Sequence, residues 1–121
     1  MSTITTFMVI SIQVAQMNNT SEMIVKYYKT FAGFNVPLRL IQPFSKEEAL
    51  GSRHAYYIGY FSKKNNILQR VEKIHNGKLI FTHVYSYHPN GVIKRLETTT
   101  ADGKLLFKDF DERGKPIERN E

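Results

Sequence analysis

The sequence contains no cysteine and no tryptophan among its 121 residues. The absence of cysteine excludes disulfide bonds, thiolate zinc sites, iron–sulfur clusters and cysteine nucleophiles. The seven glycines stand singly, so no glycine-rich phosphate-binding loop is present. The most apolar stretch, residues 7–15, is much shorter than the roughly 20 residues that cross a bilayer. We therefore predict a cytoplasmic protein with no cofactor and no membrane partner.

The N-terminal segment differs in composition from the rest of the chain. Residues 7–15 have the length of a signal-peptide core, but no Lys or Arg precedes them and no small-residue cleavage site follows. Residues 18–21 (Asn-Asn-Thr-Ser) are typical of a linker. A mass of 14.1 kDa supports one hydrophobic core. We predict a leader, disordered or edge segment over residues 1–22 and one β-rich domain over residues 23–121.

The charge of the chain is basic but scattered. Seventeen Lys and Arg against 11 Asp and Glu give a net charge of +6, which favours nucleic-acid binding through the release of counterions. The longest basic runs, however, are the pairs Lys63-Lys64 and Lys94-Arg95. Soluble domains commonly carry a net charge of about 2 to 8, so a solvated surface is the simpler interpretation.

Residues 24–51 predict a β-hairpin followed by a short helix. β-branched and aromatic residues over 24–31, turn residues over 32–35 and a second apolar run over 36–41 indicate two strands, and Pro37 places the second at an edge or a bulge. Ser45 and Glu48 then form the pattern of a capping box. A helix of about two turns needs the support of the sheet.

The second half of the chain has turn signals at regular intervals. Asn-Gly and Asp-Gly pairs favour tight hairpin turns because both central residues need a positive φ. They predict an antiparallel meander of up to six strands over residues 53–117. The fold class is therefore mainly β (α+β with one short helix): an N-terminal hairpin, a short helix, and a twisted antiparallel meander able to curl around the helix. The turns lie at Asn65-Asn66, Asn76-Gly77, Asn90-Gly91, Asp102-Gly103 and Arg113-Gly114.

Two-residue turns would bring several polar residues into one row. His83 would lie opposite Arg70 and Leu96, and Leu96 opposite Asp109, with Lys94 one step along. Such neighbours come within reach across strands, so Asp109 would orient His83 while Arg70 holds an anion. The alternative is a polar end of the sheet, whose cross-strand pairs add little stability. The same register predicts a core face with Leu68, Ile74, Leu79, Phe81, His83, Tyr85, Tyr87, Val92, Leu96, Leu105 and Phe107.

Dedicated catalytic and metal-binding patterns are missing from the chain. The four histidines have neither the i, i+4 spacing of a helix nor the i, i+2 spacing of a strand that would bring two imidazoles together, and no serine lies in a nucleophile elbow. We predict no metal site and no catalytic residue, which favours a protein that is not an enzyme. The histidines are His54, His75, His83 and His88.

The seven tyrosines are the most informative side chains for function. Adjacent residues of a strand point to opposite faces, so Tyr27-Tyr28 and Tyr56-Tyr57 each expose a ring unless a second layer covers it. Exposed tyrosines can anchor a protein partner or stack single-stranded bases; the alternative is packing across strands. The predicted binding residues are Tyr56, Tyr57, Tyr85, Arg70, His83, Lys94 and Asp109.

Three segments resemble a family of small uncharacterised bacterial proteins. Residues 28–41 contain a Pro-Leu-Arg-Leu strand after a tyrosine-rich start, residues 52–57 end in Tyr-Tyr, and residues 85–91 read Tyr-Ser-Tyr-His-Pro-Asn-Gly. Residues 87–93 and 110–117 also resemble the short aromatic-turn-glycine hairpin repeats of cell-surface and toxin-associated arrays. The first resemblance covers about residues 24–117 and implies a tyrosine-rich β domain of unknown function.

Together these observations favour a small non-enzymatic protein-binding module that uses tyrosines and basic residues on the sheet. Binding of single-stranded nucleic acid is the first alternative. An enzyme or small-ligand site around His83, Arg70 and Asp109 is the second. An open meander also leaves edge strands, so a homodimer through a sheet edge is a further expectation.

Overall fold

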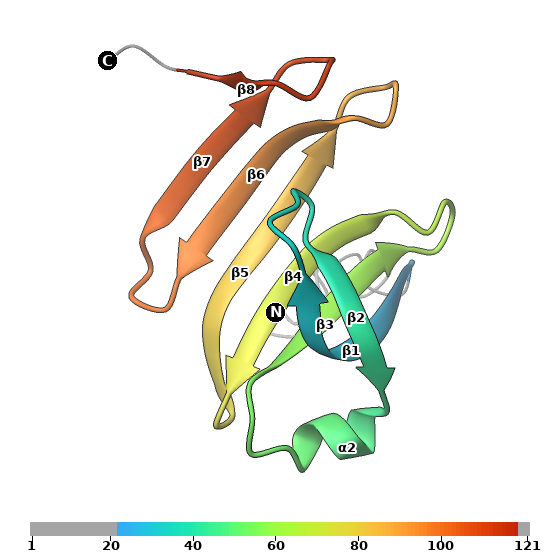
Figure 1. The fold of residues 1–121 in the computed structure, drawn as a ribbon, viewed down its shortest axis with the longest axis vertical. Coiled ribbons are helices and arrows are strands. Elements are labelled where there is room, and N and C mark those ends of the chain that lie inside the picture. The colour runs from blue at the N-terminus through green and yellow to red at the C-terminus, as the bar shows by residue number, and fades with distance from the viewer. Residues whose placement is uncertain (1–21, 119–121) are drawn as a thin grey trace, which may run out of the picture.

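The computed structural model describes residues 22–118 and shows an eight-stranded antiparallel sheet that stays open (Figure 1). The strand order is β2-β1-β3-β4-β5-β6-β7-β8, which confirms the predicted mainly β fold. Except for Glu22, the predicted N-terminal segment lies outside the described residues. The elements are β1 (Met23–Ala32), β2 (Arg39–Phe44), α2 (Lys46–Leu50), β3 (Tyr56–Ser62), β4 (Leu68–His75), β5 (Lys78–Tyr87), β6 (Ile93–Thr100), β7 (Leu105–Phe110) and β8 (Pro116–Ile117).

The predicted capping box begins the helix α2. The Ser45 hydroxyl accepts from the Glu48 N–H and the Glu48 carboxylate accepts from the Ser45 N–H, each at 3.1 Å. The helix packs against β1 and buries Ala49, but none of its residues joins the main hydrophobic cluster. The sheet therefore does not curl around the helix. Within residues 22–118 no helix is long and apolar enough to cross a membrane.

The six-stranded meander over β3 to β8 is confirmed, but its turns are of three kinds. The β3–β4 turn has a four-residue loop, and the Ser62 N–H donates to the Ile67 carbonyl at 2.8 Å. Asn76 and Gly77 form a two-residue turn in which both φ angles are positive, 53° and 72°. The last three turns have three-residue loops, each ending in a glycine of positive φ. In these turns the N–H before the loop donates to the carbonyl after it, at 2.8–2.9 Å: His88 to Val92, Thr100 to Lys104 and Asp111 to Lys115.

The predicted register was wrong at three places, and two of the errors exchange the faces of the sheet. Between β5 and β6, the three-residue loop and the bulge at Lys94 shift the register by two residues, so His83 lies opposite Thr98 instead of Leu96 and keeps its face. Between β4 and β5 the turn is as predicted, but the extra residue Ile80 makes a bulge, so Arg70 lies opposite Val84 instead of His83. Between β6 and β7 the three-residue loop moves Asp109 opposite Arg95 instead of Leu96. Both Arg70 and Asp109 therefore lie on the face that His83 does not share.

The hydrophobic core lies on one face of the sheet, which we call the inner face. It carries Tyr57, Val71 and Tyr85, and the connection between β1 and β2 folds over it (Figure 1). Gly59 permits this approach, because a Cβ there would lie 2.9 Å from Leu40 Cδ1. The buried cluster is Tyr57, Val71, Tyr85, Ile93 and Phe110, with Tyr28, Val36, Leu38, Leu40, Leu68, Phe81, Tyr87, Val92 and Leu96 packed against it.

Two regions of the sheet differ in how they are covered. Strands β1 to β5 form the region that we call the curled half. There the β1–β2 hairpin folds back over the inner face of the sheet. Strands β6 to β8, which we call the wing, extend away from the curled half (Figure 1). Leu79, Leu105 and Phe107 were predicted in the core but are 45%, 50% and 49% exposed. For Leu105 and Phe107 the cause is the register shift at the β6–β7 loop, which turns them to the other face, the outer face.

Candidate functional site

The tyrosines do not form the exposed binding surface that was predicted. Tyr56 and Tyr57 point to opposite faces, yet both are buried: Tyr57 lies in the inner core, and Tyr56 contacts the rings of Tyr27 and Phe44 on the outer face. Tyr85 is also buried, and the other tyrosines are half-buried. The prediction failed because aromatic residues of the N-terminal hairpin cover both faces of β3.

Tyr85 and His83 form a hydrogen-bonded pair on the inner face of β5. The Tyr85 hydroxyl oxygen accepts from the Leu38 N–H at 3.1 Å and lies 3.2 Å from His83 Nδ1. The hydroxyl hydrogen of buried Tyr85 needs an acceptor, which Nδ1 supplies, so His83 carries its own proton on Nε2. Burial lowers the pKa of His83 and raises the pKa of Tyr85 to about 12.

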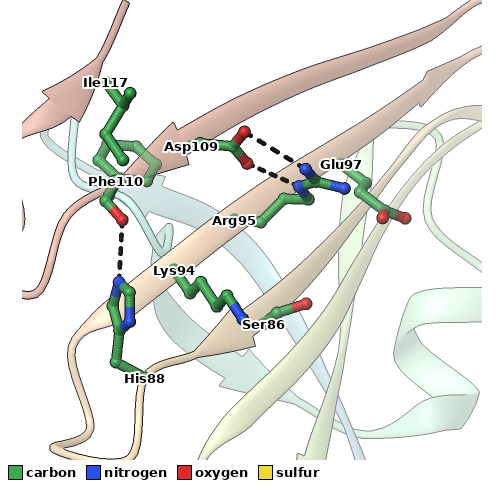
Figure 2. Close-up of a pocket in the computed structure, with 8 residues that line it drawn as sticks. All are labelled: Ser86, His88, Lys94, Arg95, Glu97, Asp109, Phe110 and Ile117. Atoms are coloured by element: carbon green, nitrogen blue, oxygen red, sulfur yellow. Dashed lines mark hydrogen bonds and ion pairs between the residues drawn. The ribbon is translucent and has the colours of Figure 1, made fainter.

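Lys94 and Asp109 both line a groove of about 440 Å³ on the outer face, which we call the outer groove (Figure 2). Lys94 is the extra residue of a bulge between β5 and β6, and the bulge re-aims its side chain beside Arg95. Asp109 accepts two hydrogen bonds from Arg95, at 2.6 and 3.3 Å. The groove is lined by Ser86, His88, Lys94, Arg95, Glu97, Asp109, Phe110 and Ile117.

The charges of the outer groove are balanced. Arg95 and Lys94 line the groove together with Asp109 and Glu97, and Arg95 lies between the two carboxylates (Figure 2). The hydrogen bond that Arg95 donates to Asp109 raises the pKa of Arg95. His88 Nε2 lies 2.9 Å from the Phe110 carbonyl oxygen, so this nitrogen carries the proton and donates it. Among residues 22–118 no serine or carboxylate is hydrogen-bonded to His88, so the described part of the groove has no nucleophile activated by a base.

Arg70 lies on the outer face of β4, separate from the outer groove. Its guanidinium donates to Glu72 at 2.7 Å and lies 5.5 Å from the centre of the Tyr60 ring. Tyr60 also donates to Glu72, at 2.5 Å; burial, and then this hydrogen bond, raise the pKa of Tyr60. Arg70 is thus part of a surface network between β3 and β4.

The predicted site residues consequently fall into separate groups. Tyr57, Tyr85 and His83 lie on the inner face, whereas Lys94 and Asp109 share the outer groove. The proposed acid–base pair of His83 and Asp109 beside Arg70 is excluded, because the bulge and the three-residue loop place these side chains on opposite faces. Tyr56 and Arg70 lie elsewhere on the outer face. Among residues 22–118 no three His, Asp or Glu side chains are grouped closely enough to hold a metal ion.

Sequence reasoning predicted open sheet edges but did not locate one at β7. Strand β8 pairs with it only at Asp109 and Phe110, so Leu105–Lys108 have no neighbouring strand on that side among the described residues. Leu105, Leu106 and Phe107 are each about half exposed. The sequence signal was the apolar run Leu105-Leu106-Phe107, which does not alternate as a half-buried strand should.

The backbone of β7 presents open hydrogen-bonding groups at this edge. The Lys104 carbonyl accepts from Thr100, towards β6, and the Asp111 N–H donates to Lys115, towards β8. Backbone groups of successive residues in a strand point to alternate sides, and the β6–β7 register is constant. The N–H and C=O groups of Leu105 and Phe107 therefore point outwards, away from β6.

Comparison with known proteins identifies a family but no characterised relative. A model described as "Family of unknown function (DUF6156)" matches residues 20–119. No curated protein and no solved structure matches the chain. The resemblance to an uncharacterised family of small β domains is thereby confirmed, while its bacterial origin stays a prediction. The family match supplies no activity, so any function must be inferred from the surface of the chain itself.

Proposed function

This chain belongs to a protein family of unknown function, and we propose that it is a non-enzymatic protein-binding module that captures an extended segment of its partner at the edge of β7. One observation carries the proposal: the backbone N–H and C=O groups of Leu105 and Phe107 point outwards with no strand beside them among the described residues. An added strand would pair with these groups, as in other proteins that bind peptides by strand addition.

The side chains of β7 define the partner's chemistry. Leu105 and Phe107 point to the outer face, and Leu106 points to the inner face. All three are about half exposed, and apolar patches on a soluble protein mark interaction sites. A partner strand with apolar residues on both faces would cover them. The partner is therefore an extended, mainly apolar segment, and the tyrosines do not contact it.

The opposite edge of the sheet is less suited to strand addition. Strand β2 forms that edge, but it contains Pro43, which lacks an N–H, and Gln42 has a positive φ of 59°. Proline and local kinks are the features by which natural sheets protect their edges from pairing. The unprotected edge is thus β7, where Leu105–Lys108 contain no proline.

A displayed library of extended peptides, selected on the full chain, tests the proposal. The decisive variant is Phe107→Pro, since it removes an outward N–H without removing a hydrogen bond to β6. The control is Phe107→Thr, which keeps the N–H and a residue suited to strands. We expect the selection to yield peptides that bind the wild type. The same peptides should bind Phe107→Thr more weakly and should not bind Phe107→Pro, although circular dichroism shows that both variants are folded.

Two results would separate the proposal from its alternatives. A wild-type dimer that Phe107→Pro converts to a monomer, measured by analytical ultracentrifugation, would support strand addition and identify the partner as a second copy. Binding of a labelled single-stranded oligonucleotide that falls steeply with salt and is unchanged in Phe107→Pro, together with a failed peptide selection, would contradict the proposal.

A further inference from the structure

The inner face carries a cavity of about 370 Å³, which we call the inner cavity, between the β1–β2 connection and strands β3 to β5. Its volume is within the range of small-molecule sites, about 300 to 1,000 Å³. Aromatic and aliphatic side chains make most of its wall. The lining residues are Phe31, Gly33, Phe34, Asn35, Val36, Leu38, Tyr57, Lys73, Phe81 and His83.

The aromatic walls of the inner cavity are fixed by contacts with one another. The Phe31 ring meets the Tyr57 ring edge-on, with their centres 5.5 Å apart, and the Phe81 ring stacks on His83 at 4.5 Å. The ring centres of Tyr57 and Phe81 are 6.5 Å apart. These rings form apolar surfaces suited to the hydrocarbon or aromatic body of a ligand.

Among the described residues that line the inner cavity, Lys73 is the one cation and none is a carboxylate. The ammonium group of half-buried Lys73 lies 5.7 Å from the centre of the Tyr57 ring. Lys73 forms no ion pair with any described residue. A charge that is partly removed from water and has no counter-ion favours an anionic ligand.

His83 supplies a directed hydrogen-bond donor to the same wall. Its Nδ1 accepts the Tyr85 hydroxyl hydrogen, and Tyr85 is held in turn by the Leu38 N–H. The imidazole therefore carries its proton on Nε2, which has no hydrogen-bond partner among the described residues. A neutral histidine fixed in one tautomer donates to an oxygen ligand.

We propose that the inner cavity binds a small aromatic monocarboxylate, with its ring against Tyr57 and Phe81 and its carboxylate at Lys73 and the His83 Nε2–H. The site goes beyond the proposed protein-binding function, because it lies on the curled half and uses no residue of β7. Charge complementarity selects a carboxylate over a neutral or cationic ligand, and the rings select an aromatic body over a polar one.

Titration of the full, isotope-labelled chain with phenylacetate, followed by NMR, tests the inner cavity. Phenylacetamide is the matched probe because it has nearly the same shape but no charge. We expect saturable shifts centred on Tyr57, Lys73, Phe81 and His83, and an affinity for phenylacetamide about tenfold lower, as loss of a charge-assisted hydrogen bond implies. Shifts centred on the outer groove, no saturation at millimolar phenylacetate, or equal affinity for the two probes would overturn the inference.

Two lysine variants separate the site from general charge effects. Lys73→Gln should weaken phenylacetate binding about tenfold and leave phenylacetamide unchanged. Lys108→Gln is the control, since Lys108 also lies 5.7 Å from an aromatic ring, that of Phe110, but on the wing. If Lys73→Gln unfolds, His83→Phe serves instead: it keeps a flat ring beside Phe81 and removes the Nε2–H. Undiminished phenylacetate binding in the folded variant would contradict the proposal.

Discussion

The curled half and the wing are built from the same antiparallel hairpins, yet among the described residues the wing contributes only Ile93, Leu96 and Phe110 to the core. In the curled half the β1–β2 connection places Val36, Leu38 and Leu40 over Tyr57 and its neighbours. In the wing no described element covers the first residues of β7, and Leu105, Leu106 and Phe107 stay half exposed. The comparison teaches that burial of a strand here depends on a distant segment folding over it, and that strand pairing alone does not produce a core.

The strongest way to test this contrast is to remove one aromatic ring from each region. Tyr57→Ala deletes a ring that is 5% exposed, and Phe107→Ala deletes one that is 49% exposed. We expect Tyr57→Ala to lower the free energy of unfolding by about 3–5 kcal/mol and Phe107→Ala by about 1 kcal/mol or less. Chemical denaturation measures both. Equal losses would show that the wing is as tightly packed as the curled half.

A smaller loss of stability should follow from a substitution that pushes β2 away from the inner face. Gly59→Ala would bring its Cβ within 2.9 Å of Leu40 Cδ1 and of the Phe61 ring, and such crowding typically costs about 1–3 kcal/mol of stability. Leu40→Ala opens space at the same point. We therefore expect Gly59→Ala to cost less stability in the Leu40→Ala background than in the wild type, which a double-mutant cycle measures. Strict additivity of the two losses would contradict close packing of β2 on Gly59.

The smallest expected effect is a dependence of stability on pH that arises from His83 in the curled half. Burial lowers the pKa of His83 below its usual value near 6.5, so below that value the unfolded chain binds more protons than the folded one. Stability is therefore complete above about pH 6.5 and falls as the pH decreases towards the folded pKa. The slope stays below that of one proton, about 1.4 kcal/mol per pH unit, since His83 is only half-buried.

Thermal melting between pH 5 and 7.5 measures this slope. His83→Phe should remove its contribution, and His75→Phe, at the exposed end of β4, is the control for the loss of a histidine. A slope that persists in His83→Phe would assign the titration to another group and leave the neutral state of His83 without support.

Local chemistry made the turns and the helix start predictable from the sequence. Ser45 and Glu48 are three residues apart and bond to each other's backbone, so no distant residue is needed to recognise the cap. The Asp102-Gly103 pair likewise marks a turn. It does not distinguish a two-residue loop from the three-residue loop observed, and that one residue decides which face Asp109 occupies.

The candidate sites were less predictable because they depend on tertiary packing. Nothing in the residues around Ile80 marks the bulge that separates Arg70 from His83. Tyr56 was expected to be exposed because the covering rings of Tyr27 and Phe44 come from other strands. Lys94 and Asp109 share the outer groove, although the register used to group them was wrong.

The position of β1 between β2 and β3 also affects how the chain can fold. It creates the pairing of β1 with β3, the one contact in the described sheet between strands that are not consecutive. Each turn of the wing closes over three residues, whereas this pairing must first close the whole of residues 33–55, and the entropy cost of closure rises with loop length. Folding rates fall as contacts become less local. We therefore expect the arrival of β1 beside β3 to limit the folding rate, while the wing forms quickly from its own turns.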